Sequence, residues 1–200
     1  MSNHLPIDFD KFNFCPVVKY NGEWHIFDFT GGYKPAPKRK KPWGIGRFNE
    51  KRPGMYVGPQ YKNGRDIHMG IDFWTPVGEP VYAFYEGEIA YFRDNDRKAD
   101  YGPTIVTKHF LEGTTLFALY GHLSRSSLEG ITDGQQFEAG ELLGHVGSKQ
   151  VNGGWEPHLH FQLSLEDPGE ADMPGVVSEE NLQLALEKYL DPRLIVGNLY

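Results

Sequence analysis

Short segments in which apolar and polar residues alternate constrain the fold of this chain more than any other feature. Alternation with a period of two is typical of β-strands, whose successive side chains point to opposite faces of a sheet. The clearest such segments are residues 80–85, 88–92, 104–110 and 115–120. Turn-forming pairs such as Glu86-Gly87 and Glu112-Gly113 lie between them, and short turns favour antiparallel pairing. The sequence therefore predicts a mainly β fold, built as a compact antiparallel sheet or sandwich.

The two ends of the chain differ from this central part. Residues 24–29 alternate well enough for one more strand, whereas residues 34–53 contain four prolines and indicate an irregular segment on the surface. Near the C-terminus, Ser178 is a suitable helix N-cap, and apolar residues recur at helical spacing as far as Tyr189. We therefore expect three parts, which are an N-terminal extension wrapping the core at residues 1–60, a β domain at 61–170, and a C-terminal helical extension at 171–200.

Composition excludes some classes of function. The formal net charge of −7 argues against a nucleic-acid partner, because a phosphate binder needs clustered lysine and arginine. The one basic cluster, from Lys38 to Lys41, lies among prolines, and we expect a solvated loop there in preference to a patch that recognises an acidic surface. Cys15 is the only cysteine, so no disulfide can form within the chain, and a fold of 200 residues does not need one.

The sequence also bears on location. Its first ten residues lack the basic start and the continuous apolar core of a secretory signal, and no later segment approaches the ~18 apolar residues of a membrane span. We therefore expect a cytoplasmic protein without a membrane span. A secreted or periplasmic protein whose signal had been trimmed would look the same. The oligomeric state does not follow from the sequence.

A strand that carries two histidines is the first candidate for a functional site. In the segment from Trp155 to Leu165, His158 and His160 alternate with Leu159 and Phe161. The period of two places both imidazoles on one face of a strand, with their positions roughly 7 Å apart. Two imidazoles on one face indicate a metal site, although a surface strand can also carry two histidines for no chemical reason.

Further residues could complete such a site if the fold brings them together. A catalytic zinc typically keeps three protein ligands and leaves a fourth position for water. His68, Asp72 and His160 would supply two imidazoles and one carboxylate. His122 and His158 would then lie beside the metal, where they could accept a proton or stabilise an oxyanion. A lone histidine is more often a surface or hydrogen-bonded residue, and by default we assign structural roles to the remaining ones: His4, His25, His109 and His145.

Taken together, the motifs resemble the lysostaphin/LytM-type zinc metallopeptidases. The resemblance runs from His68 to about Leu165, which is half the chain, and it keeps the order of the motifs. They include His68-x-Gly70-Ile71-Asp72, Thr75-Pro76-Val77-Gly78-Glu79-Pro80-Val81-Tyr82-Ala83, Tyr120-Gly121-His122-Leu123-Ser124 and Pro157-His158-Leu159-His160-Phe161.

The resemblance implies both a fold and an activity. It implies a mainly antiparallel β domain in which His68, Asp72 and His160 bind one Zn²⁺ per chain, while His122 and His158 assist catalysis. Family members commonly hydrolyse amide bonds in short cross-linking peptides of bacterial cell walls, by attack of a zinc-activated water. The expected substrate is therefore a peptide or a fragment of peptidoglycan. The sequence does not decide which of His122 and His158 is the general base.

Some segments depart from the wall-digesting members. Residues 100–106 and 152–155 look more like the peptidase-like modules fused to class III aminotransferases. Tyr101 is expected near the site, and Trp155 either lines a groove for a sugar or peptide or packs at the edge of the core. The alternative function is a non-hydrolytic β module that binds or scaffolds and keeps its zinc. Retention of all five polar site residues favours the enzyme, because a buried histidine or aspartate without a partner costs stability.

Overall fold

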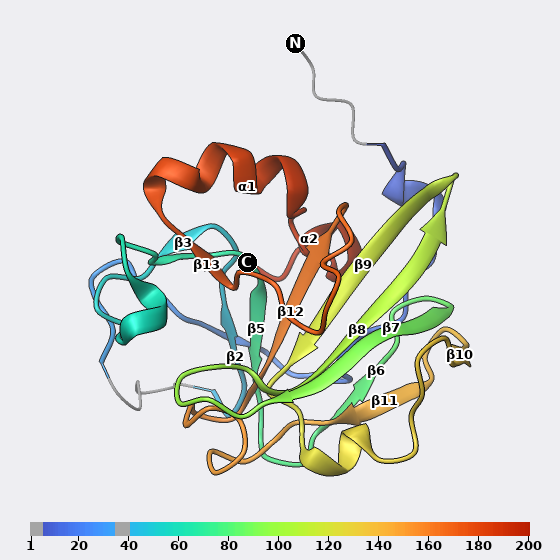
Figure 1. Cartoon of the computed structure of the whole chain (residues 1–200), viewed down its shortest axis with the longest axis horizontal. Helices are drawn as coiled ribbons and strands as arrows, with labels where there is room; N and C mark the ends of the chain where they lie inside the picture. The colour runs from blue at the N-terminus through green and yellow to red at the C-terminus, as the bar shows by residue number, and fades with distance from the viewer. Residues whose placement is uncertain (1–5, 35–40) are drawn as a thin grey trace.

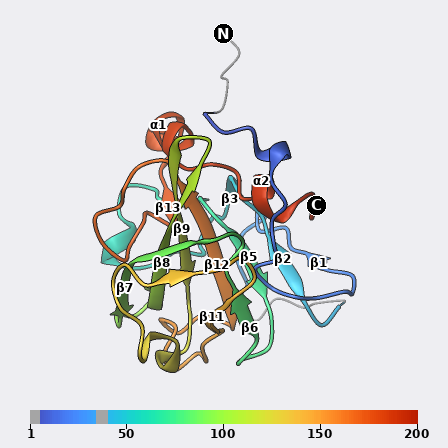
Figure 2. The ribbon, with the colours of Figure 1, turned by 90° about the vertical axis from the view of Figure 1, so that its right-hand side faces the viewer.

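Three β-sheets form the framework of the protein. The computed structural model describes residues 6–34 and 41–200, and within them it contains an eight-stranded sheet, here called the main sheet, and two smaller ones. The main sheet holds, in spatial order, β1 (His25–Ile26), β2 (Gly44–Gly46), β5 (Ile71–Trp74), β12 (His158–Ser164), β9 (Thr114–Gly121), β8 (Gly102–Leu111), β7 (Gly87–Asn95) and β10 (Gln136–Phe137). Figure 2 shows this order from β7 on one side to β1 on the other.

The smaller sheets lie against the main one. One pairs β11 (Leu142–His145) with β6 (Pro80–Tyr82), and the other places β4 (Ile67–His68) between β13 (Val176–Val177) and β3 (Glu50–Lys51). Helix α1 (Leu182–Lys188) lies beside β3 and β13 in Figure 1, and α2 (Arg193–Val196) follows it. Single 3₁₀ turns occur at Phe9–Lys11, Pro59–Tyr61, Arg125–Leu128 and Glu179–Asn181. The mainly β, antiparallel fold expected from the sequence is confirmed, and the pair β1 and β2 is parallel.

The two faces of the main sheet have different roles. Every second side chain of β5 and β12 is apolar and belongs to the largest hydrophobic core, namely Ile71, Phe73, Leu159, Phe161 and Leu163. The side chains between them, including Asp72, His158 and His160, line a cavity on the opposite face. The alternation seen in the sequence therefore separates a face that stabilises the fold from a face that carries polar groups.

Several expected elements are shorter than the sequence indicated. The strand expected at residues 24–29 is only His25–Ile26, although the amide of Phe27 still donates to the carbonyl of Ile45 at 2.9 Å, and the rings of Phe27 and Phe29 pack on Trp74. The strand expected at 80–85 ends at Tyr82. The helix expected from residue 178 begins at Leu182 after a 3₁₀ turn.

Ser178 does not cap that helix as expected. It makes no capping hydrogen bond to a backbone amide, and its hydroxyl accepts instead from the side-chain amide of Asn181 at 3.1 Å. The apolar spacing was nevertheless informative, because Ala185 of α1 packs with Ile67, Met69 and Val177 in a small core of its own.

Residues from the predicted N-terminal extension join the sheets. Gly44, Ile45 and Gly46 of β2 pair with Trp74, Phe73 and Asp72 of β5, and Glu50 of β3 pairs with His68 of β4. The proposed boundaries of the three parts, at residues 60 and 170, stay predictions. The solvated loop expected at Lys38–Lys41 lies outside the described residues except for Lys41, and His4 also lies outside them. In the described part of the chain, no helix is both long and apolar enough to cross a membrane.

Candidate active site

Strand register brings together residues that are far apart in the sequence. His160 lies opposite Asp72 in the pairing of β12 with β5, and opposite Gly121 in its pairing with β9. Side chains directly opposite each other in an antiparallel pair have Cβ atoms about 5 Å apart. His68 lies on β4, four residues before Asp72 in the sequence. The three residues expected to hold a metal are therefore neighbours, and all three are buried.

Three potential ligand atoms face one another at short distances. Nε2 of His68 lies 3.0 Å from Nδ1 of His160 and 3.1 Å from Oδ1 of Asp72. The third side of this triangle, from His160 Nδ1 to Asp72 Oδ1, is also 3.1 Å. Ligand atoms about 2.0–2.1 Å from a tetrahedral zinc are themselves a little over 3 Å apart, so the triangle has nearly the right size for such an ion.

Hydrogen bonds on the far side of each ring fix the tautomers. His68 Nδ1 lies 2.9 Å from the carbonyl of Arg47, which can only accept, so that nitrogen carries the proton. His160 Nε2 lies 3.0 Å from Oε1 of Gln162, and the amide of Gln162 is oriented by its own bond to the Pro174 carbonyl. Both rings therefore turn lone pairs toward the carboxylate of Asp72.

This arrangement fits a cation. Two imidazole lone pairs and a carboxylate oxygen converge within 3.1 Å, and none of the three atoms carries a proton to share. Three buried acceptors facing one another repel unless a positive charge lies among them. Among the residues that the structure describes, His68, Asp72 and His160 form a group whose ligand atoms lie close enough together to hold a metal ion.

Electrostatics keep the cluster in its metal-binding form. Burial acts to raise the pKa of Asp72, but His68 in its protonated form and the Arg52 guanidinium outweigh burial and hold that pKa well below its usual range. Burial lowers the pKa of His68 to about 4, and the positive charge of Arg52 acts in the same direction. At neutral pH Asp72 is thus a carboxylate and His68 a neutral imidazole, the forms that bind metal.

Two more imidazoles stand beside the cluster. The ring centroids of His122 and His158 are 4.3 Å apart, and Nε2 of His158 lies 3.8 Å from Oδ1 of Asp72. Nδ1 of His122 lies 3.1 Å from the carbonyl of Asn152, and Nδ1 of His158 lies 2.6 Å from the carbonyl of Glu156. Each Nδ1 therefore carries the proton, and each Nε2 keeps a lone pair.

Burial keeps both of these rings neutral. It lowers the pKa of His122 well below the usual value, with a further contribution from the neighbouring His158. It lowers the pKa of His158 as well. His122 also has a backbone φ of 65°, a conformation that is uncommon outside glycine. Neutral imidazoles with an available Nε2 can accept a proton at pH 7.

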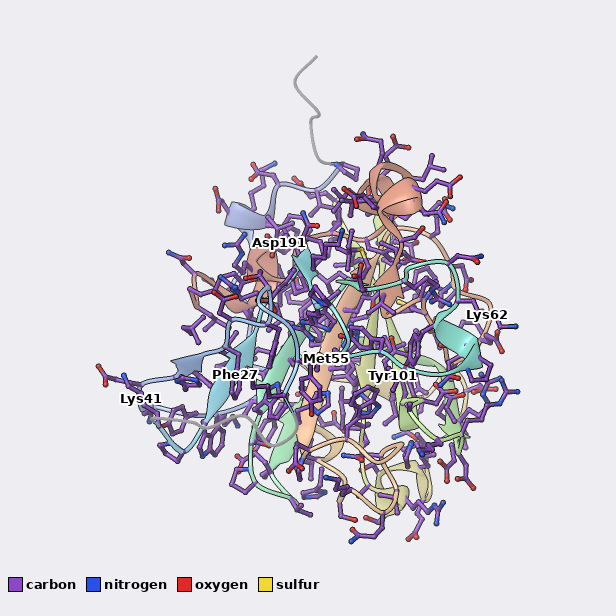
Figure 3. The ribbon with its side chains drawn as sticks, turned by 90° about the vertical axis from the view of Figure 1, so that its left-hand side faces the viewer. Phe27, Lys41, Met55, Lys62, Tyr101 and Asp191 are labelled. Carbon is purple, nitrogen blue, oxygen red and sulfur yellow. The ribbon has the colours of Figure 1, made fainter. Side chains whose placement is uncertain are left out.

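The cluster opens into a cavity of about 550 Å³. Tyr101 lines it, with its hydroxyl 3.5 Å from Nε2 of His160 and donating to the Met173 carbonyl at 3.0 Å. Trp155 lines the cavity and packs against Tyr56, at a distance of 5.9 Å between ring centroids. Figure 3 labels Met55 and Tyr101, two lining residues that belong to the N-terminal part of the chain and to the β domain. Both expected neighbours of the site, Tyr101 and Trp155, therefore line the cavity.

Gly70 allows β12 to pack closely against the segment that carries His68 and Asp72. A Cβ atom at this position would lie 2.6 Å from Cε1 of His160 and 2.8 Å from the carbonyl oxygen of Phe161. Contacts this short require the neighbours to move. We expect Gly70→Ala to destabilise the fold by about 1–3 kcal/mol and to weaken metal binding, as measured by thermal unfolding and by titration with zinc. Gly31→Ala is the matched control, because a Cβ there meets nothing within 4 Å. Native-like zinc binding by Gly70→Ala would contradict the expectation.

The fold and the site together define a metallopeptidase domain. Residues 66–171, which are more than half of the 200-residue chain, match peptidase family M23. The chain belongs to this family.

Curated relatives match about half of the chain. DD-carboxypeptidase/endopeptidase Mpg of Neisseria meningitidis is 37% identical over 100 residues, which are 50% of this chain and 20% of Mpg. Peptidoglycan DD-endopeptidase ShyA of Vibrio cholerae is 33% identical over 97 residues, which are 48% of this chain and 20% of ShyA. The match thus spans about a fifth of the length of these relatives.

A solved structure supports the fold. The catalytic domain of the antimicrobial peptidase lysostaphin from Staphylococcus simulans superposes with a TM-score of 0.53. The superposition covers 78% of this chain and 93% of that domain, at 24% sequence identity. The lysostaphin-type architecture expected from the sequence is confirmed.

The structure adds site residues that the sequence did not indicate. Arg52 and Glu50 form a buried ion pair behind Asp72, and Gln162 orients His160. Gln162 could have been found, because it follows His158 and His160 on the same face of the strand. Arg52 lies in the proline-rich and lysine-rich segment, where nothing local in the sequence distinguishes a buried arginine from an exposed one.

Proposed function

We propose that this protein is a zinc-dependent endopeptidase that hydrolyses amide bonds in peptide cross-links of peptidoglycan or in related small peptides. One observation carries the proposal. Three unprotonated ligand atoms converge from His68, Asp72 and His160, and two neutral imidazoles with available lone pairs stand beside them in the same cavity. A site that only stored metal would have no need of the second pair of imidazoles.

The residues suggest a division of roles. Nε2 of His68, Oδ1 of Asp72 and Nδ1 of His160 would hold the ion. Zinc in such a site supplies Lewis-acid polarisation of the scissile carbonyl and activates a water molecule at neutral pH. His122 and His158 face the same cavity, and Nε2 of one of them would take the proton that the attacking water loses.

The same proton then completes the reaction. As the water oxygen bonds to the carbonyl carbon, the C–N bond breaks, and the imidazolium returns its proton to the leaving amine nitrogen. The second imidazole would donate a hydrogen bond to the developing oxyanion when it is protonated. Each ring has its Nδ1 bonded to a backbone carbonyl, so hydrogen bonding does not distinguish which of the two takes the proton.

The substrate class follows from the relatives. Mpg is named as a DD-carboxypeptidase/endopeptidase and ShyA as a peptidoglycan DD-endopeptidase, and the segment of this chain that matches the family, residues 66–171, contains the whole cluster. A cavity of about 550 Å³ with an aromatic rim is large enough to receive a short peptide. The cytoplasmic location expected from the sequence stays a prediction.

Metal content and cleavage should be measured on the same preparation. We expect about one zinc per chain by elemental mass spectrometry, and release of shorter products from purified cross-linked wall peptides by liquid chromatography and mass spectrometry. The matched control is His145→Ala, since His145 lies on β11 outside the cluster, and it should behave like the native chain.

Each other outcome contradicts part of the proposal. A chain that takes up no zinc, even when zinc is added, would refute the metal site. A chain that holds zinc but cleaves none of the cross-linked peptides would favour the alternative, a non-hydrolytic module that keeps its zinc.

A further inference from the structure

A buried arginine holds the outer oxygen of the metal-binding carboxylate. Arg52, which is fully buried, donates from Nη1 to Oδ2 of Asp72 at 2.7 Å. The inner oxygen, Oδ1, is the one that faces His68 and His160. The guanidinium therefore occupies one oxygen of Asp72 and leaves only the other for an ion.

The arginine is itself fixed from several directions. Its Nε donates to Oε2 of Glu50 at 2.9 Å, and its Nη1 also donates to the hydroxyl of Tyr56 at 3.0 Å. Its Nη2 donates to the carbonyl of Arg47 at 3.1 Å. A planar guanidinium with bonds on three nitrogens has very little rotational freedom, so it can hold its partner in one orientation.

The same carbonyl connects the arginine to a second ligand. The oxygen of Arg47 accepts from Nη2 of Arg52 and from Nδ1 of His68, at 3.1 and 2.9 Å. Residues 47–52 thus orient two of the three ligands, Asp72 through a side chain and His68 through a backbone oxygen. This segment precedes residues 66–171, the part of the chain that matches the family.

The chain leaves space for this contact. Gly46 of β2 lies opposite Asp72, and a Cβ at Gly46 would be 2.8 Å from both Nη2 of Arg52 and Oδ2 of Asp72. Any larger residue would push apart the two groups that form the ion pair. Strand β2 can therefore run past the ion pair because Gly46 has no side chain.

We propose that Arg52 is a positioning residue for the metal site, and that it fixes Asp72 as a ligand through a single oxygen. The proposal rests on the metal site of the proposed function. Contacts of this kind to metal ligands typically change metal affinity by about 10- to 100-fold when they are removed. A fixed carboxylate needs no reorganisation when the ion binds, whereas a free one must be ordered or can bind through both oxygens.

The decisive variant removes the arginine together with the charge of its acidic neighbour Glu50. Among the described residues, Arg52→Met alone would leave the buried carboxylates of Glu50 and Asp72 with Arg47 as the one remaining cation paired to either of them, through Glu50, and the chain could then fail to fold. The double variant Glu50→Gln/Arg52→Met removes one negative and one positive charge, so the net charge beside the metal is unchanged. Its effect on metal binding is compared with that of Arg52→Lys, which keeps the positive charge, to separate orientation from the electric field of the arginine.

The readout is zinc affinity of the full chain. Stripped protein is titrated with Zn²⁺ in competition with a chromophoric chelator, at a temperature where circular dichroism shows every variant to be folded. We expect the dissociation constant of Glu50→Gln/Arg52→Met to rise by at least about tenfold. Glu50→Gln alone keeps the bond between Arg52 and Asp72, so its affinity should stay close to the native value.

A conservative variant separates positioning from general support. Arg52→Lys keeps the positive charge but replaces the several donor nitrogens of the guanidinium with one ammonium nitrogen. The lysine can therefore contact Asp72 without also reaching Glu50 and the Arg47 carbonyl. We expect it to restore part of the affinity. A purely structural role would lower the unfolding temperature of the metal-free protein and leave the dissociation constant of the folded protein unchanged.

The outcomes are distinguishable from those of the proposed function. An unchanged or lower dissociation constant in Glu50→Gln/Arg52→Met would overturn the positioning role. A native chain that binds zinc but cleaves no peptide would refute the endopeptidase, and the affinity comparison would still decide the role of Arg52. A native chain that binds no zinc would overturn both.

Discussion

His160→Ala is expected to abolish zinc binding and hydrolysis together. In the proposed site His160 would provide one of three ligand atoms, and its Nδ1 lies 3.0 Å from Nε2 of His68 and 3.1 Å from Oδ1 of Asp72. Removing a group that merely supports a ligand costs about 10- to 100-fold in metal affinity, so removing a ligand itself should cost more than about 100-fold. Elemental mass spectrometry and thermal unfolding with and without added zinc will measure the loss.

The unfolding experiment has a further use. Native protein at a zinc concentration about 100 times the dissociation constant should gain about 2.7 kcal/mol of stability, because the ion binds only the folded state. His160→Ala should lose this gain, while its metal-free stability should change less, because the substitution also removes one of three mutually repelling acceptors. A variant that kept the zinc-dependent gain would show that His160 is not a ligand.

His122→Asn is expected to lower the turnover rate by about 10²- to 10⁴-fold while zinc stays bound. The Nδ1 of His122 is bonded to the Asn152 carbonyl and not to any of the three converging atoms, and the ring centroid of His122 lies 4.3 Å from that of His158. General acid–base catalysis by a positioned side chain contributes a factor of this size. Asparagine is the suitable replacement because it tolerates the left-handed backbone found here, where φ is 65°.

Comparison with His158→Ala tests whether the two imidazoles act as a unit. If one transfers the proton and the other stabilises charge in the same step, the double variant should lose little more than the worse single variant. Turnover should be measured at saturating peptide, with zinc content determined on the same samples. Native turnover in His122→Asn would show that this residue has no catalytic role.

Local periodicity was enough to predict the strand that carries His158 and His160. Leu159, Phe161 and Leu163 alternate with polar residues, and burial of one face follows from that pattern alone. The pairing of this strand with β5 was not predictable from spacing, because register depends on which strands meet. The resemblance to a known family supplied what periodicity could not, namely that His68 and Asp72 belong to the same site.

The contribution of residues 44–56 could not be predicted. Prolines and basic residues indicated a surface segment, and such a composition is indeed typical of loops. Arg52 is nevertheless fully buried, because Glu50 and Asp72 together neutralise its charge and because its donors meet the Tyr56 hydroxyl and the Arg47 carbonyl. Burial of a charged residue depends on partners that lie elsewhere in the fold.

Pairing of β2 with β5 limits how this catalytic unit can be moved between proteins. A fragment cut to residues 66–171 would leave β5 as an open edge, with the amide and carbonyl groups that now bond to Gly44 and Gly46 free to recruit a strand from another molecule. It would also lose the arginine behind Asp72. The smallest transplantable module therefore begins some twenty residues before the recognisable family segment, and fusion or truncation designs should keep residue 44 and all that follows it.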